Sequence, residues 1–282
     1  MSMTSIMTNH AAMAALQSLN RTNDALAQVQ KRISTGYRVA DAKDDGGAFA
    51  VAQTVRADTA TLNAVNEQLG GTRGLIDISL TSLEQVSKTM IEVRTVLTRL
   101  ADGTLNDESR NQYNQQYAQL RTQIANFLAD ANCNGRNMIT GVSPTDDIIM
   151  MRSESAASTD LYTLPALGPD TNFLVAVGPF TTAAAAQAAL TPTSGDFDTI
   201  NMAINDAMNR LGADARYVDA QINYNFDKID SMEGSLGALI DANLAKESAR
   251  LQALQIRQQL GTQTLSIANQ SPQYLMSLFG GR

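Results

Sequence analysis

Proline is distributed unevenly along this 282-residue chain, and its distribution limits what the two ends can fold into. Five of the six prolines lie between residues 144 and 192, and the sixth is Pro272. A proline in a helix interior costs about 3 kcal/mol, so the proline-free stretches 1–143 and 193–271 are the parts that can form long helices. The sequence therefore predicts two helical arms on either side of a different middle segment.

Apolar residues in the first arm recur every seven residues, the spacing of one face of a coiled-coil helix. One row predicts a short amphipathic helix that ends at Gly36, and a second row predicts a much longer helix after it. Their members are Ala12, Leu19, Leu26 and Ile33 in the first row, and Ala48, Val55, Leu62, Leu69, Ile76, Leu83, Met90 and Leu97 in the second. We expect Gly70, Gly71 and Gly74 to loosen or bend the longer helix near its middle.

A third helix is expected over about 107–130, with Asp107 capping its start, and Asn134-Gly135 should then make a turn. Beyond it, residues 141–195 contain short strand-like runs between Ser/Thr/Pro/Gly-rich connections, which favours β-hairpins and exposed loops. The fold class predicted is mainly α, a long coiled-coil-like helix bundle built from both chain ends, with a small β-rich outer segment.

The second arm resumes the seven-residue rows and is expected to be helical nearly to Ser271. Pro272 should disturb the final turn or begin a new one. The rows contain Phe197, Ile204, Leu211 and Val218, then Ile222, Ile229 and Leu236, then Ile240, Leu244, Leu251 and Leu254. The apolar cluster expected after the proline contains Tyr274, Leu275, Leu278 and Phe279.

Long amphipathic helices near both ends imply that the ends meet, because an isolated helix of this kind is marginal in water. Two such helices still expose much apolar surface when they pair, and each uncovered Leu forgoes roughly 1.5–3 kcal/mol of burial. The apolar rows of the central helices can form an ordinary monomer core. For the terminal helices, we expect copies of the chain to supply the missing cover.

Residues for catalysis are scarce. His10 is the only histidine and Cys133 the only cysteine, which excludes Ser-His-Asp, Cys-His and multi-histidine metal sites within one chain. The glycines at 70–74 lack the Lys and Ser/Thr of a phosphate loop, and the Asp residues at 41–58 do not have the spacing of a calcium loop. No cofactor, metal or catalytic residue is expected, and the chain is not expected to be an enzyme.

Charge and hydropathy narrow the partners further. The net charge of −7 and pI near 4.7 disfavour binding to a phosphate backbone or an anionic membrane. No run of about 18 apolar residues predicts a membrane span, and no standard secretory signal is visible. We therefore expect neither nucleic-acid binding nor membrane insertion, and export, if it occurs, without a cleaved signal.

At both ends the residues resemble the bacterial flagellins. The most specific pieces of the first block are Ile33-Ser34-Thr35-Gly36 and Ala42-Lys43-Asp44-Asp45. In the last block they are Gln259-Leu260-Gly261, Ala268-Asn269-Gln270, Pro272-Gln273 and Leu275. With a moderately similar stretch at 46–140, the resemblance covers roughly two-thirds of the chain and does not extend over 141–195.

The resemblance implies an extracellular structural subunit of the flagellar filament that confers motility. It implies export through the flagellar type III apparatus, with a chaperone and cap proteins as partners, and polymerisation with itself and possibly with other flagellins. Three domains follow: a coiled-coil core of 1–43 with 236–282, a helical rod of 44–140 with 196–235, and an exposed outer segment, 141–195. The core interface would contain Leu16, Leu19, Leu26, Val29, Ile33, Leu244, Leu251, Leu254, Leu260, Leu265, Leu275, Leu278 and Phe279.

Innate immune receptors bind some flagellins through a rod-domain helix that carries an Arg in the pattern L-x-R-V-R-E-L-A. The stretch 90–97 looks like this pattern, but Glu92 stands where the first Arg would be, while Arg94 keeps the second. We expect weak or absent activation of Toll-like receptor 5. Glycosylation of the outer loops is a further expectation, with Ser153, Ser155, Ser158 and Thr159 as candidates.

Two alternative functions stay open at this point. A hook-filament junction protein shares the terminal blocks at lower similarity, and the strength of the ANQSPQ and ISTG blocks favours a flagellin over it. A flagellin-like enzyme with a catalytic insert in the middle is the other alternative, and cleavage of casein by the purified protein would support it. Residues 141–195 contain no His or Cys, which leaves little for hydrolysis.

Overall fold

The computed structural model describes residues 9–140, 147–155, 160–167, 179–192 and 195–279, with side chains described as far as residue 270. It consists of two compact units, one made of Met1–Ala57 with Ser231–Arg282 and the other of Asp58–Asp230. The expected strand-like run 172–180 falls mostly outside the described residues, as do the side chains of Tyr274, Leu275, Leu278 and Phe279. The mainly helical fold class is confirmed.

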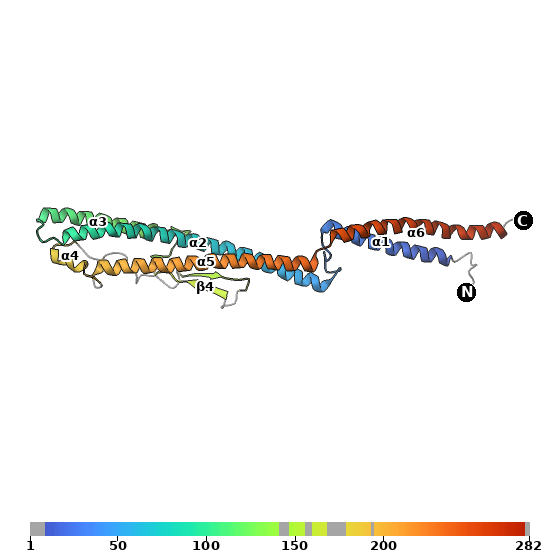
Figure 1. The fold of residues 1–282 in the computed structure, drawn as a ribbon, viewed down its shortest axis with the longest axis horizontal. Coiled ribbons are helices and arrows are strands. Elements are labelled where there is room, and N and C mark those ends of the chain that lie inside the picture. Colours follow the sequence, from blue (N-terminus) through green and yellow to red (C-terminus); the bar gives the residue numbers. More distant parts are fainter. Residues whose placement is uncertain (1–8, 141–146, 156–159, 168–178, 193–194, 280–282) are drawn as a thin grey trace. The chain divides into compact units, whose positions relative to one another are not determined.

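In the larger unit, most of α2 (Gly46–Leu100) packs with α3 (Asp107–Asp130) and most of α5 (Asp196–Ile240) around one buried core (Figure 1). The seven-residue row predicted for the long helix is its core, because every member that lies in this unit is at most 1% exposed. These members are Leu62, Leu69, Ile76, Leu83, Met90 and Leu97. α2 is one continuous helix through Gly70, Gly71 and Gly74, so these glycines do not interrupt it.

A further seven-residue row of α2 contains Val51, Val65, Val86, Val93 and Leu100, and it is interrupted by the polar residues Thr72 and Ser79. Thr72 and Ser79 are buried, and each hydroxyl donates to the carbonyl four residues earlier, on Gln68 at 3.2 Å and on Leu75 at 2.9 Å. A hydroxyl that bonds its own helix is tolerated in a core because its hydrogen-bonding capacity is met locally. These positions therefore do not break the core.

An amide pair crosses this core. Asn225 is fully buried and its Nδ2 donates to Oδ1 of Asn66 at 2.9 Å, while Gln221 donates to Asn225 Oδ1 at 3.0 Å. Asn225 is the next member of the row Phe197, Ile204, Leu211 and Val218, which the hydrophobic pattern alone did not extend to it. A buried amide at such a position is satisfied by only a few neighbours, and so it favours one helix register.

Short antiparallel strands lie in the middle of the chain. β1 (Asn132–Cys133) pairs with β2 (Arg136–Asn137) across the Asn134-Gly135 turn, whose two residues both have positive φ, as a tight hairpin turn requires. β3 (Ile148–Met151) pairs with β4 (Leu161–Leu164), and α4 (Ala183–Ala189) follows.

The turn and the helix at 107–130 were predicted correctly, but the residue that caps α3 was not. Asn106 rather than Asp107 accepts from the Ser109 amide, because Asp107 already lies in the first helical turn.

The smaller unit pairs the two ends of the chain, with α1 (His10–Thr35) beside α6 (Leu244–Phe279) (Figure 1). The expectation that Pro272 would disturb the last helix is wrong, because α6 runs through it to Phe279. A proline supplies no N–H to the carbonyl four residues earlier, which here is that of Ala268. That carbonyl accepts from the side chain of Asn9 instead, at 2.7 Å. The missing bond is thus replaced by one from the other end of the chain.

Candidate assembly interface

The inner face of the α1–α6 pair is a narrow apolar seam. Val29 of α1 and Leu254 of α6 are buried, and Leu19, Leu26 and Leu251 are half-buried. The α6 positions on this face alternate in steps of four and three, as in a coiled coil. They are Glu247, Leu251, Leu254, Gln258, Gly261, Leu265 and Ala268.

Polar contacts fix the two helices in an antiparallel arrangement. At one end Arg32 forms an ion pair with Glu247 at 3.4 Å, and near the middle Gln258 donates to Asn23 at 2.9 Å. The helices approach closely at Gly261, where an added Cβ would lie 3.2 Å from Cδ1 of Leu19. A Cβ at Gly261 would therefore require the Leu19 side chain to shift by a few tenths of an ångström.

A second apolar row runs along the opposite side of α6. Its largest members are Ile256, Leu260 and Ile267, which are 58%, 57% and 64% exposed. With Ala249 and Ala253 they follow the four-and-three spacing of the inner seam, displaced by two residues, so they face away from α1. Unlike single exposed apolar side chains, which are common, these repeat along several turns of one helix face. The polar Gln263 occupies the one position of this pattern between Leu260 and Ile267. We call Ala249, Ala253, Ile256, Leu260 and Ile267 the outer row.

On α1 the large apolar residues that are exposed are Met13 and Leu16, at 63% and 48%. The predicted interface residues thus fall into two groups. Leu19, Leu26, Val29, Ile33, Leu251, Leu254 and Leu265 are buried or half-buried, whereas Leu16, Leu244 and Leu260 are exposed. Leu275, Leu278 and Phe279 lie where side chains are not described. Ile256 and Ile267 were missed, although their spacing from Leu260 in the sequence could have found them.

The loop after α1 joins it to the segment between α5 and α6. Gly36 ends α1 in the left-handed conformation, with φ of 76°, and its amide donates to the carbonyl of Arg32. The amides of Arg38 and Val39 donate to the carbonyl of Ile240, and the Ala242 amide donates to that of Gly36. Val39, Ala52 and Ile240 close a small buried cluster beneath these bonds.

Replacing Gly36 by Ala is expected to lower the free energy of unfolding of the terminal unit by about 1–2 kcal/mol. An L-residue resists the left-handed backbone that this helix end requires. The added methyl would meet nothing within 4 Å, so the strain would come from the backbone alone. Thermal unfolding of the full chain measures the effect. Gly46→Ala is the control, since Gly46 has equal space and no positive φ, and an equal loss in both variants would contradict the explanation.

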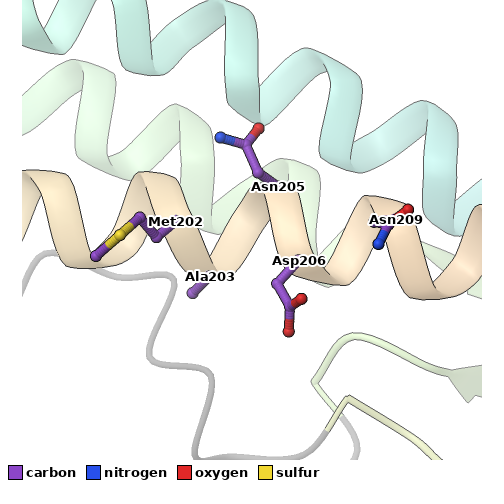
Figure 2. A pocket seen from close by; sticks show the side chains of 5 residues that line it. All are labelled: Met202, Ala203, Asn205, Asp206 and Asn209. Atoms are coloured by element: carbon purple, nitrogen blue, oxygen red, sulfur yellow. The ribbon is translucent and has the colours of Figure 1, made fainter.

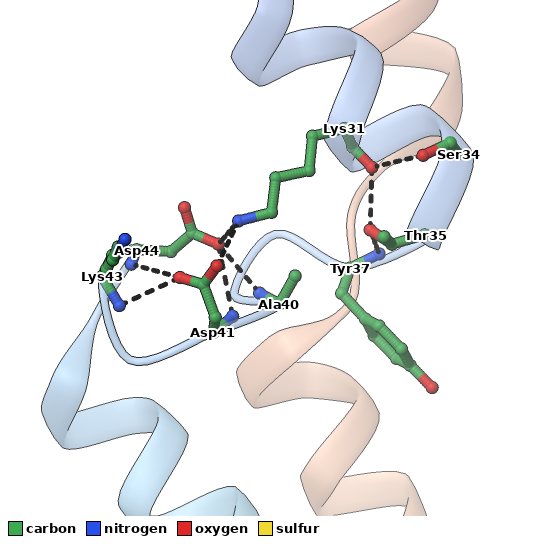
Figure 3. Close-up of polar contacts among 8 residues, drawn as sticks. All are labelled: Lys31, Ser34, Thr35, Tyr37, Ala40, Asp41, Lys43 and Asp44. Atoms are coloured by element: carbon green, nitrogen blue, oxygen red, sulfur yellow. Dashed lines mark hydrogen bonds and ion pairs between the residues drawn. The ribbon is translucent and has the colours of Figure 1, made fainter.

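A charged clasp holds the loop that follows α1. Lys31 Nζ lies 2.7 Å from Asp41 Oδ2 and 2.9 Å from Asp44 Oδ2, and Asp44 also accepts from the amides of Ala40 and Asp41 (Figure 3). The hydrogen bond from Lys31 lowers the pKa of both carboxyl groups, and their bonds raise the pKa of Lys31. Asp45 caps α2 by accepting from the Ala48 amide at 3.0 Å, whereas Asp44 binds within the loop.

The clasp should loosen in acid. Since the pKa values of Asp41 and Asp44 are lowered in the folded state, their contribution is present above the usual value of 3.8 and is lost as pH falls below it. The raised pKa of Lys31 means that its contribution is lost only as pH rises above 10.5. We expect faster amide exchange of residues 40–44 below about pH 4, relative to the intrinsic rate. Asp44→Asn should remove much of this pH dependence, and an unchanged pH profile would count against the clasp.

Elsewhere the surface offers shallow depressions. One, of about 610 Å³, is lined by Met202, Ala203, Asn205, Asp206 and Asn209, all on α5 (Figure 2). It presents amides and one carboxylate but no nucleophile next to a base. Among the described residues, no three His, Cys, Asp or Glu side chains are grouped so as to hold a metal ion. Nor is any described helix long and apolar enough to span a membrane.

Glu92 and Arg94, the residues expected in the receptor-recognition region, are both exposed on α2. Val93 between them is buried in the core, so the two charged side chains leave the helix on either side of it. Ile91 beside them is 68% exposed.

The fold and this interface define a class of protein, a helical structural subunit whose paired ends carry an uncovered apolar row. Two sequence models match the chain, the bacterial flagellin N-terminal helical region over residues 6–143 and the C-terminal helical region over 196–279. Flagellin FljM of Caulobacter vibrioides is 36% identical, and the alignment covers 99% of this chain and 100% of that protein. A flagellin of Brucella melitensis is 32% identical, again over 99% and 100%.

The chain belongs to the bacterial flagellin family. It is therefore a structural subunit of the bacterial flagellar filament, outside the cell, and not an enzyme. Its partners include other flagellin subunits, since the family assembles into a filament. The crystal structure of Bacillus cereus flagellin is also similar, with a TM-score of 0.49 and 23% identity over 56% of this chain and 88% of that one.

Proposed function

We propose that the chain enters the filament through its two ends, with the outer row of α6 and the exposed Met13 and Leu16 of α1 packing on neighbouring subunits. The observation that carries this proposal is the outer row, a regular apolar surface that the described residues of its own chain leave uncovered. Burial of a Leu or Ile is worth roughly 1.5–3 kcal/mol, so a row of them is a substantial driving force for association. The inner seam then serves to hold α1 and α6 together.

Negative-stain microscopy tests this proposal after the purified chain is seeded or salted out. Long uniform filaments in which the ends are protected from protease support it. Protein that stays monomeric under these conditions, or filaments whose residues 9–35 and 244–279 remain as accessible as in the monomer, would overturn it.

A three-part organisation follows from the same proposal. Residues 1–43 with 236–282 form the filament core, 44–140 with 196–235 pack between neighbouring subunits, and 141–195 face outward. The exposed apolar surface of the two ends supports the assignment of the filament core. The core that α2, α3 and α5 bury among themselves supports a second domain with its own fold. Cysteine labelling of assembled filaments tests it, because labels should attach in 141–195 and be excluded from the terminal helices.

We propose three further partners, which are the flagellar export apparatus, its chaperone and the cap proteins. The similarity of this chain to flagellins supports all three partners, because flagellins share one export route. Secretion of the chain by a flagellated host that lacks its own flagellin tests the proposal. Loss of secretion on removal of the host's type III export function is the expected result, and unchanged secretion would refute it.

We propose that this chain activates Toll-like receptor 5 only weakly, because residue 92 is the acidic Glu92 rather than an Arg. An acidic side chain would repel a partner surface that accepts an Arg, and Glu92 is exposed and accessible. We expect a reporter-cell response at least tenfold below that to an enterobacterial flagellin, and a stronger one for Glu92→Arg than for Glu92→Gln. A response to the unaltered chain as strong as the enterobacterial one would disprove this proposal.

Glycosylation is proposed on the outer segment. Ser155 is exposed and Ser153 half-buried, while Ser158 and Thr159 lie outside the described residues. Intact-mass measurement of native filaments tests this, because added mass should map to these four residues. A filament protein of unmodified mass would refute it.

A further inference from the structure

Pro272 leaves one backbone carbonyl within α6 without its helical hydrogen-bond donor. In a helix each carbonyl accepts from the amide four residues later, and a proline has no amide hydrogen to give. Pro272 is the only proline in α6, so before the last turn of that helix Ala268 is the one residue whose carbonyl has no donor at its helical position. A helix in water would leave this carbonyl to solvent.

Asn9 supplies the missing donor. Its Nδ2 donates to the Ala268 carbonyl at 2.7 Å, while its Oδ1 accepts from the Ala12 amide at 3.0 Å as the N-cap of α1. The side-chain amide of Asn9 therefore caps α1 and also donates the hydrogen bond that α6 lacks. Of the four favoured N-cap residues, Asp has no donor and Ser and Thr are shorter, so Asn is the one suited to both tasks.

This arrangement distinguishes one helix register from its neighbours. Sliding α1 by one heptad along α6 would place Asn9 beside the carbonyl of Gly261 or Leu275. The carbonyl of Gly261 already has the amide of Leu265 as its helical donor, and that of Leu275 has the amide of Phe279. Only at the observed register does the Asn9 amide meet a carbonyl that lacks a donor.

The apolar seam by itself discriminates less well between registers. The inner face of α1 carries Ala12, Ala15, Leu19, Thr22, Leu26, Val29 and Ile33, which repeat with the same seven-residue period. A slide of one heptad still places some apolar residues opposite one another, although it breaks the Arg32–Glu247 and Asn23–Gln258 contacts, and it displaces α1 by roughly 10 Å. Such a slide would also move Met13 and Leu16 relative to the outer row, and so change the surface that neighbouring subunits meet.

We propose that Asn9 and Pro272 form a register key, in which the carbonyl freed by the proline selects one alignment of α1 on α6. Asn9 is a positioning residue in this arrangement. The key explains why a helix that is otherwise free of proline keeps one at position 272. It also links residues in the first and last sequence blocks, which are 259 positions apart.

Distances between spin labels test the key. In a Cys133→Ala chain, labels on Gln17 and Gln252, which are both exposed, report how α1 lies along α6. Filaments diluted with unlabelled chain should give one distance. Asn9→Asp keeps the oxygen that caps α1 but loses the donor, and Pro272→Ala restores the helical donor to Ala268. Each variant should add a second distance, because α1 is then displaced by about 10 Å along α6.

Pro272→Ala separates the key from a merely stabilising role, because alanine favours the helix and should make α6 itself more resistant to exchange. A second distance in this more helical variant supports register selection. A single, unchanged distance in both variants would overturn the proposal.

A double-mutant cycle gives an independent measure. Asn9→Asp should speed amide exchange of residues 262–270 about fivefold in the Pro272 chain, and less than twofold when position 272 is Ala. Equal effects in the two backgrounds would show that Asn9 and Pro272 are not coupled. Ser18→Ala, on an exposed α1 site, is the control and should leave exchange unchanged in both backgrounds.

Discussion

Deleting residues 251–282 is expected to abolish polymerisation and to leave the unit Asp58–Asp230 folded. The deletion removes Leu251, Leu254 and Leu265 from the inner seam and the large members of the outer row. Without them Leu19, Leu26 and Val29 lose their cover, and at roughly 1.5–3 kcal/mol each this exceeds what an isolated α1 can offset. Both the helix pair and its external surface are then lost.

The larger unit should keep its fold after the deletion, because its main buried core extends from Leu62 to Val218 and contains none of the deleted residues. Circular dichroism should retain a cooperative transition, and negative-stain microscopy with seeds of the full chain should show no elongation. The full chain, purified and seeded in parallel, is the positive control. Filaments grown from the truncated chain would refute this role for α6.

The central helices were predictable because their rows are almost uninterrupted. Leu62, Leu69 and Ile76 are large, apolar and seven apart, and each is buried as expected. Asn225 shows where the pattern fails, since the seven-residue period places it in the core row while its polar side chain suggests an exposed position. Its burial depends on Asn66, which lies 159 positions away in the sequence and which only the tertiary structure brings into contact with it.

The terminal interface was predicted only in part, for a physical reason. The inner seam of α6 includes Glu247, Gln258 and Gly261, which dilute its hydrophobic signal, while Ile256 and Leu260 on the opposite side strengthen a competing one. With apolar residues on two faces, the sequence shows that the helix needs two partners but not which face each partner covers. The contacts of α1 with the inner face resolve this ambiguity.

Pro272 illustrates a second limit. A proline predicts a helix end because a carbonyl loses its donor, and that local expectation is sound for an isolated helix. Here the donor comes from Asn9, at the other end of the chain, so α6 continues through the proline. Compensation of this kind depends on a contact between distant residues and cannot be deduced from the pattern around the proline.

Replacing Ile256 and Leu260 together by Glu is expected to prevent filament growth without separating α1 from α6. Both side chains are more than half exposed, so the monomer loses little when they become charged. In the filament each would bring an unpaired carboxylate into an apolar contact, and full burial of each apolar side chain is worth roughly 1.5–3 kcal/mol. Since each side chain is already partly covered in the monomer, the two together lose about 2–4 kcal/mol of burial per subunit, a reduction of the association constant by roughly thirtyfold or more.

A matched variant separates the loss of the row from the added negative charge. Gln252→Glu with Gln259→Glu adds the same charge to a chain of net charge −7, at exposed α6 positions outside the outer row. Its critical concentration for polymerisation should rise only a few-fold, since exposed charges are screened at physiological salt. Sedimentation of seeded samples measures both variants. Because the inner seam is untouched in each, an equal effect in the two would show that net charge, and not the outer row, governs assembly.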